Sequence, residues 1–155
     1  MPTTNLAEPA SVVFAINKLL NNTNYQLISL DRLDYSGTYN RIQEIVDNNP
    51  LWKKRIKIVW HDLKAEINPI IKKQIGDPEI ILHVAAASHV DRSIEDPMSF
   101  VLDNIVGTTN ILEFARRDKK LEKFLYFSTD EVFGPAPNNI KYKENDRYRS
   151  GNPYA

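Results

Sequence analysis

Four short apolar runs alternate with segments of helical spacing, and this alternation constrains the fold more than any other feature of the chain. The runs predict strands over residues 25–30, 55–60, 79–84 and 123–128. The segments between and before them predict helices over Ala10–Leu20, Arg41–Asn48, Lys64–Ile75 and Pro97–Arg117. Strands that alternate with helices favour an α/β fold with a doubly wound parallel sheet.

The last predicted helix has an apolar side that should face the sheet. Its members are Phe100, Val101, Ile105, Thr108, Ile111, Leu112 and Ala115. The segment Ser88–Ser93, by contrast, is expected to be a loop.

The alternation begins on a helix, as though a first strand were missing. Residues 1–5 supply no apolar run, and Leu6–Val12 contains no glycine. We therefore expect residues 1–155 to be a partial domain, a fragment that lacks its first strand.

Composition excludes several classes of function. The 20 basic side chains balance the 20 acidic ones, so no net field favours nucleic acid. The chain has no cysteine and only three histidines, so no metal site is expected. It has no apolar run that could span a bilayer and no signal-peptide pattern, which predicts a cytoplasmic protein without membrane contact.

A hydroxyl-rich, acidic segment follows the fourth predicted strand. Ser128, Thr129, Asp130 and Glu131 lie at its carboxyl end, the edge where open α/β sheets bind ligands. The alternative is that Ser128, Thr129 and Asp130 only cap a turn. A second segment, Asn152–Ala155, brings Tyr154 some 25 residues later and favours a catalytic role for the acids.

Three motifs carry a resemblance to a known family. They are His83–Ser93, Asn104–Thr108 and Ser128–Gly134, with Leu30–Tyr35 as weaker support. The chain resembles the NAD-dependent epimerase/dehydratase family, the extended short-chain dehydrogenases/reductases with a Rossmann-like fold. Within it, the motifs resemble those of the dTDP-glucose 4,6-dehydratases, and the likeness spans about half of a full-length member.

The resemblance implies NAD as cofactor. Asp31 would bond the adenosine ribose, while Asp62 and Leu63 would flank the adenine. Ala85, Ala86 and Ala87 would let the cofactor approach the backbone, and Ser128 is assigned to the same site. Taken alone, Asp31 could simply start a turn, and Asp62 could cap the helix that the sequence predicts from Lys64.

The resemblance also implies a substrate, a nucleotide-activated hexose, and a division of labour. Ser88 and Asn104 would lie on the substrate side, with Asn104 supporting the catalytic region. Thr129, Asp130, Glu131 and Tyr154 would be catalytic: Tyr154 deprotonates the sugar 4-hydroxyl, Glu131 takes the proton from C5, and Asp130 protonates the departing 6-hydroxyl.

Other functions remain open at this point. UDP-glucose 4,6-dehydratases share the Thr-Asp-Glu pattern, whereas 4-epimerases and decarboxylases of the superfamily typically lack acids at both positions. A non-catalytic remnant that acts as an interaction module is the third possibility.

The family pattern includes features that this sequence does not show. They are a glycine-rich turn after the first strand, a Lys four residues after the tyrosine, and a substrate domain. We therefore expect the 155-residue chain to be inactive alone. In full-length members we expect a homodimer, formed partly through Pro97–Arg117.

Overall fold

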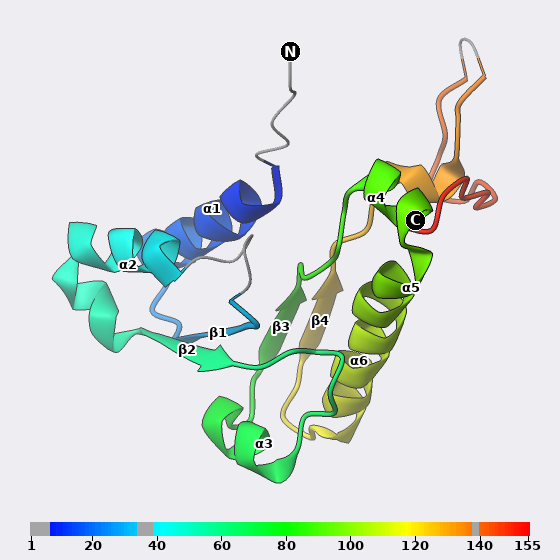
Figure 1. Cartoon of the computed structure of the whole chain (residues 1–155). Helices are drawn as coiled ribbons and strands as arrows, with labels where there is room; N and C mark the ends of the chain where they lie inside the picture. Colours follow the sequence, from blue (N-terminus) through cyan, green and yellow to red (C-terminus); the bar gives the residue numbers. More distant parts are fainter. Residues whose placement is uncertain (1–6, 34–38, 138–139) are drawn as a thin grey trace. The chain divides into compact units, whose positions relative to one another are not determined.

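The computed structural model describes residues 7–33, 39–137 and 140–155 and shows strands that alternate with helices (Figure 1). The strands are β1 (Leu27–Asp31), β2 (Ile56–Trp60), β3 (Ile80–His83) and β4 (Lys123–Tyr126). The helices are α1 (Ala7–Asn22), α2 (Tyr39–Asn48), η1 (Pro50–Lys54), α3 (Pro69–Ile75), α4 (Val90–Glu95), α5 (Pro97–Phe100), η2 (Val101–Val106), α6 (Gly107–Arg117) and η3 (Asp130–Phe133). Residues 1–5, Asp34 and Tyr35 lie outside the described residues.

The four strands form two parallel pairs, which confirms the predicted strands and their direction. β1 pairs with β2, with Leu27 opposite Ile56, and β3 pairs with β4, with Ile80 opposite Lys123. Among the described residues, β1 and β3 are not paired with each other, so the strands form two small sheets. The fold is thus a partial α/β arrangement of the doubly wound, parallel kind.

The chain divides into two compact units. The first comprises Met1–Asp62 with Asn68–Gly76, and the second comprises Leu63–Ile67 with Asp77–Ala155. The core of the first unit lies where α1 and α2 pack on β1 and β2. Its buried members are Ile16, Leu20, Ile42 and Ile45, with Leu27, Ile56 and Ile58 packed against them.

Arg55 connects α1 to the start of β2 in this first unit. Its guanidinium donates to the carbonyl oxygens of Leu20 at 2.9 Å and Thr23 at 2.7 Å. It also donates to the carbonyl of Tyr25. The planar fork of Arg thus satisfies carbonyls at the end of α1 and in the connection to β1 that no helix bond reaches.

In the second unit, α6 lies along the β3–β4 pair (Figure 1). His83 at the end of β3 is buried, and its Nε2 lies 2.9 Å from the Thr108 hydroxyl on α6. Phe100 and Ile111 are buried as predicted. Two members of the predicted inner side are not: Ile105 and Leu112 are 61% and 47% exposed.

The helix predicted over Pro97–Arg117 is helical throughout but not α-helical throughout. A π-helical stretch, η2, separates α5 from α6, and the Gly107 amide donates to the carbonyl of Leu102, five residues earlier. This stretch changes the number of residues per turn, so α-helical spacing assigns Ile105 to the wrong side.

Two further predictions are corrected. The helix predicted from Lys64 begins at Pro69, because Asn68 caps α3 by accepting from the amides of Ile70 and Ile71. The segment Ser88–Ser93 is not loop throughout, since α4 begins at Val90.

Candidate active site

Thr129 organises the segment that follows β4. Its hydroxyl oxygen accepts from the Glu131 amide at 3.3 Å and caps η3, which confirms the capping interpretation. The same hydroxyl lies 3.4 Å from Asp130 Oδ1. Capping fixes how the segment leaves the sheet, so it delivers Asp130 and Glu131 in one turn of 3₁₀ helix.

The two acidic side chains have different surroundings. Asp130 is exposed, whereas Glu131 is half-buried. Ser128, exposed, precedes them, and the Phe127 amide donates to the His83 carbonyl at 3.0 Å, so the ends of β3 and β4 lie side by side. The acid pair therefore leaves the same edge as the residues that follow β3.

Asn152 joins Glu131 to the turn that bears Tyr154. Its Nδ2 donates to Glu131 Oε2 at 3.0 Å. Its Oδ1 accepts from the amides of Tyr154 at 3.1 Å and Ala155 at 3.2 Å. The sequence singled out Tyr154 but not Asn152; the Asn-Pro dipeptide signals a turn without revealing a long-range partner.

Asn104 makes the second connection. Its side chain accepts from the Ala87 amide at 2.8 Å and donates to the Ala87 carbonyl at 2.9 Å. Its Nδ2 also lies 3.3 Å from the carbonyl oxygen of Tyr154. Asn104 therefore fixes both the segment after β3 and the Tyr154 turn, in keeping with the supporting role that the resemblance implies.

The structure thus brings together four predicted site residues, Ala87, Asn104, Glu131 and Tyr154, through two asparagine side chains. Ala85 and Ala86, just after β3, are exposed, and Ser88 is half-buried before α4. Small exposed residues at a strand end leave the backbone open to a ligand.

The chain from Pro135 onward returns to η3. Phe133 stacks on Tyr142 with ring centroids 5.2 Å apart and meets Tyr148 at 5.3 Å. The Arg149 amide donates to the Val132 carbonyl at 2.9 Å. These contacts hold the returning chain beside the acid pair and lead it to Asn152.

Leu63, predicted to flank the adenine, lies against η2 and α6. The Asn110 side chain donates to its carbonyl at 2.7 Å. A Cβ atom added at Gly107 would lie 3.3 Å from that of Leu63, so only glycine leaves ordinary room there. The next residue, Lys64, pairs with Asp103 at 3.6 Å.

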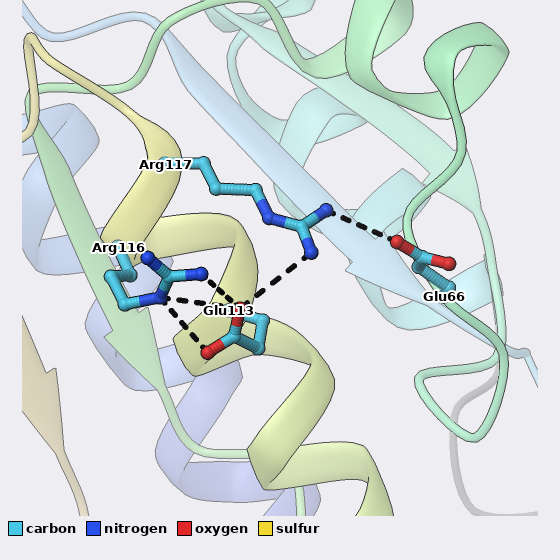
Figure 2. Close-up of polar contacts among 4 residues, drawn as sticks. All are labelled: Glu66, Glu113, Arg116 and Arg117. Carbon is cyan, nitrogen blue, oxygen red and sulfur yellow. Dashed lines mark hydrogen bonds and ion pairs between the residues drawn. The ribbon is translucent and has the colours of Figure 1, made fainter.

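An ion-pair cluster extends this attachment to the end of α6 (Figure 2). Arg117 bridges Glu66 at 3.1 Å and Glu113 at 3.6 Å. Arg116 also bonds Glu113, and this hydrogen bond is the main cause that lowers the pKa of the Glu113 carboxyl. Residues 63–67 therefore contact η2 and α6 at four positions: Asp103, Gly107, Asn110 and Arg117.

Asp31 and Asp62 belong to the first unit. Asp31 Oδ1 accepts from the Leu33 amide at 2.7 Å, so it does start a turn at the end of β1. Asp62 is half-buried and caps no helix, because α3 begins only at Pro69. That both share an edge with Asp130 stays a prediction.

Within residues 7–33, 39–137 and 140–155, no helix combines the length and the apolar character of a membrane span. No group of three or more His, Cys, Asp or Glu side chains within those ranges could hold a metal ion.

Comparison with known proteins shows which family this chain resembles in sequence. A family model described as GDP-mannose 4,6 dehydratase matches residues 14–155. The dTDP-glucose 4,6-dehydratase of Salmonella typhimurium is 33% identical over 90% of this chain and 42% of its own length. That of Haemophilus influenzae is 34% identical, with 90% and 43% covered.

Solved structures agree. A dTDP-glucose 4,6-dehydratase from Streptomyces venezuelae with NAD and TYD bound superposes with a TM-score of 0.78 at 28% identity, over 92% of this chain and 43% of that one. A UDP-Glc/GlcNAc 4-epimerase from Campylobacter jejuni has a TM-score of 0.77 at 23% identity, which shows the shared fold alone.

The parallel pairs, together with the similar solved structures, therefore define a partial Rossmann-like α/β fold. The chain belongs to the GDP-mannose 4,6 dehydratase family. It spans about two fifths of the length of the curated relatives that it matches.

Proposed function

We propose that this chain carries the acid–base residues of an NAD-dependent 4,6-dehydratase that converts a nucleotide-activated hexose, dTDP-glucose, into the 4-keto-6-deoxy sugar. The observation that carries the proposal is a hydrogen-bonded link. Asn152 bonds the carboxylate of Glu131, which is next to Asp130, and also the backbone amide of Tyr154. Elimination of water needs one group to take a proton and another to give one, and this arrangement supplies both types.

Each residue has a step that its position supports. Tyr154 takes the proton of the sugar 4-hydroxyl, to which the Thr129 hydroxyl also bonds. Glu131 takes the proton at C5, and Asp130 protonates the 6-hydroxyl so that it leaves as water. The NH₂ group of Asn152 can only donate, which suits Glu131 as the carboxylate that accepts a proton. Bound NAD would accept and return the hydride.

Part of the chain fits NAD and part does not. Exposed Ala85 and Ala86 at the end of β3 would let the cofactor reach the backbone, and Asp31 would bond its ribose. Leu6–Val12, where the family has a glycine-rich turn, contains no glycine to admit the pyrophosphate. We therefore expect the 155-residue chain to bind NAD weakly and to show no turnover alone.

The nucleotide and the reaction have close alternatives. UDP-glucose 4,6-dehydration would use the same residues, whereas 4-epimerisation would leave Asp130 and Glu131 without a task. If the chain were a non-catalytic interaction module, none of the proposed catalytic residues would have a chemical role.

An NMR titration of the 155-residue chain tests the proposal, because it detects weak binding. NAD should shift the amides of Ala85–Ala87, and Asp31→Ala should weaken the effect, while Asp47→Ala on α2 serves as the control. dTDP-glucose and UDP-glucose are compared next, with an assay for 4-keto sugar. Absence of any NAD-dependent shift at these residues would favour the interaction module, and product from the chain alone would contradict the expected inactivity.

We also infer that full-length members dimerise along α5, η2 and α6. Four apolar side chains along this helical segment are exposed: Met98, Leu102, Ile105 and Leu112. A second copy of the chain would cover them in a two-fold helix pair. Light scattering of a full-length member should give the mass of a dimer, and Ile105→Asp should lower that mass. A mass that this substitution leaves unchanged would contradict the inference.

A further inference from the structure

We propose that Asn152 is a positioning residue for the acid–base pair: it fixes the Glu131 carboxylate relative to Tyr154. The inference rests on the proposed function for its catalytic meaning, while the contact itself is testable without any activity. Asn152 is outside the residues that the motifs single out. Its hydrogen bond to Tyr154 is with the backbone amide, which takes no part in proton transfer.

The geometry uses every polar atom of one small side chain. Nδ2 bonds Glu131 Oε2 at 3.0 Å, while Oδ1 accepts from the amides of Tyr154 and Ala155. The opposite orientation of the amide would direct its oxygen at a carboxylate and its NH₂ group at two backbone donors. Only one orientation of Asn152 is therefore compatible with its neighbours.

The two halves of the side chain do different things. Oδ1 closes the turn over residues 152–155, a task that a serine hydroxyl also performs. Nδ2 reaches back 21 residues to a carboxylate on η3, which serine is too short to reach. The half-buried setting of both partners limits competition from water, so this bond restrains the Glu131 side chain.

Asn104 makes the restraint effective. It bonds the Tyr154 carbonyl at 3.3 Å and both backbone groups of Ala87. The Tyr154 turn is thereby fixed to the segment after β3, and Asn152 transmits this position to Glu131. The Glu131 carboxylate and the backbone that carries the Tyr154 phenol are thereby held together, although their segments lie more than twenty residues apart. Such fixed positions favour general acid–base catalysis.

Nitrogen-15 NMR of the 155-residue chain tests the contact. Glu131→Gln should shift the Asn152 side-chain amide signal, because a neutral amide oxygen then replaces the carboxylate that accepts from Nδ2. Asp130→Asn, which removes the adjacent carboxylate, should leave that signal in place.

A second variant separates positioning from folding of the turn. Asn152→Ser should keep the slow hydrogen exchange of the Tyr154 and Ala155 amides, because the serine hydroxyl still accepts from them. It should lose the hydrogen bond to Glu131, so the Glu131 side-chain signals should move toward the averages of a freely rotating side chain. Asn152→Ala should lose both.

The outcomes are distinct. An Asn152 side-chain signal that is unchanged in Glu131→Gln, or that shifts as much in Asp130→Asn, would overturn the proposal. So would unaltered Glu131 signals in Asn152→Ser, which would mean that Asn152 only closes the turn. Neither result depends on NAD or sugar binding, so failure of the proposed function would appear separately, in the NAD titration.

Discussion

Gly134 lies directly against the backbone of Arg149, and a methyl group at Gly134 would overlap the carbonyl oxygen of Arg149. Gly134 also has φ +74°, a conformation that side chains disfavour by about 1–3 kcal/mol. Gly134→Ala should therefore detach the returning chain from η3. Hydrogen exchange at the Arg149 amide, which donates to Val132, should become much faster.

Gly151→Ala is the matched control in the same segment. The nearest atom to an added Cβ there is Pro135 Cδ at 3.9 Å, an ordinary contact. Arg149 should exchange in this variant as it does in the unmodified chain. Equal exchange in Gly134→Ala would show that the close approach does not hold the segment.

The attachment of residues 63–67 to α6 should depend on Asn110 more than on the ion pairs. A partly buried hydrogen bond to the Leu63 carbonyl contributes about 0.5–1.5 kcal/mol. Asn110→Ala should thus speed tryptic cleavage after Lys64 several-fold.

Arg117→Ala provides the comparison, because its pairs with Glu66 and Glu113 are largely exposed (Figure 2). Such exposed pairs contribute little to stability, because solvent screens them. Cleavage after Lys64 should change little in this variant, and faster cleavage than in Asn110→Ala would reverse the ranking.

Arg55 should be the most sensitive charged residue of the first unit. Hydrogen bonds from a charged donor contribute about 1.5–3 kcal/mol each, and Lys cannot reproduce the fork that meets Leu20, Thr23 and Tyr25. Arg55→Lys should lower the thermal midpoint of this unit clearly. Lys57→Ala, which removes one exposed bond to the Gln74 carbonyl, should lower it less.

Acidification should weaken the second unit through His83. Burial lowers the pKa of this imidazole, so the folded state favours its neutral form. In the unfolded chain His protonates near pH 6.5. Below that value the unfolded state binds more protons, so stability falls with pH until the folded pKa is reached.

Urea unfolding at about pH 7 and about pH 5.5 measures this effect. His83→Gln should reduce the difference between the two values, because Gln can still meet Thr108 but does not titrate in that range. His89→Gln, at an exposed site, should preserve it. The same pH dependence in all three proteins would assign the effect to other groups.

The strands were predictable because each is a short apolar run with a clear end. Their observed bounds differ from the predicted ones by at most two residues. Parallel direction followed from the intervening helices. The Thr129 cap and the acid pair were likewise local features that one segment of sequence contains.

What the sequence did not reveal depends on partners distant along the chain. The sequence predicted a helix from Lys64 because apolar spacing takes no account of α6, which holds the preceding Leu63 through Asn110. The tie from Asn152 to Glu131 has no periodic signal at all. The roles of Asp31, Asp62 and Ser128 stay predictions, since they concern a ligand.

The π-helical stretch makes the site unusually sensitive to insertion and deletion. Asn104 lies within it, and the Gly107 amide reaches back five residues rather than four. Deleting one residue of this stretch after Asn104, such as Ile105, would let the segment become an ordinary α-helix, which is easier to form. It would also turn everything before the deletion by about 100° relative to α6. Asn104 would then face away from Ala87 and Tyr154, so a sequence change that improves the helix would dismantle the site.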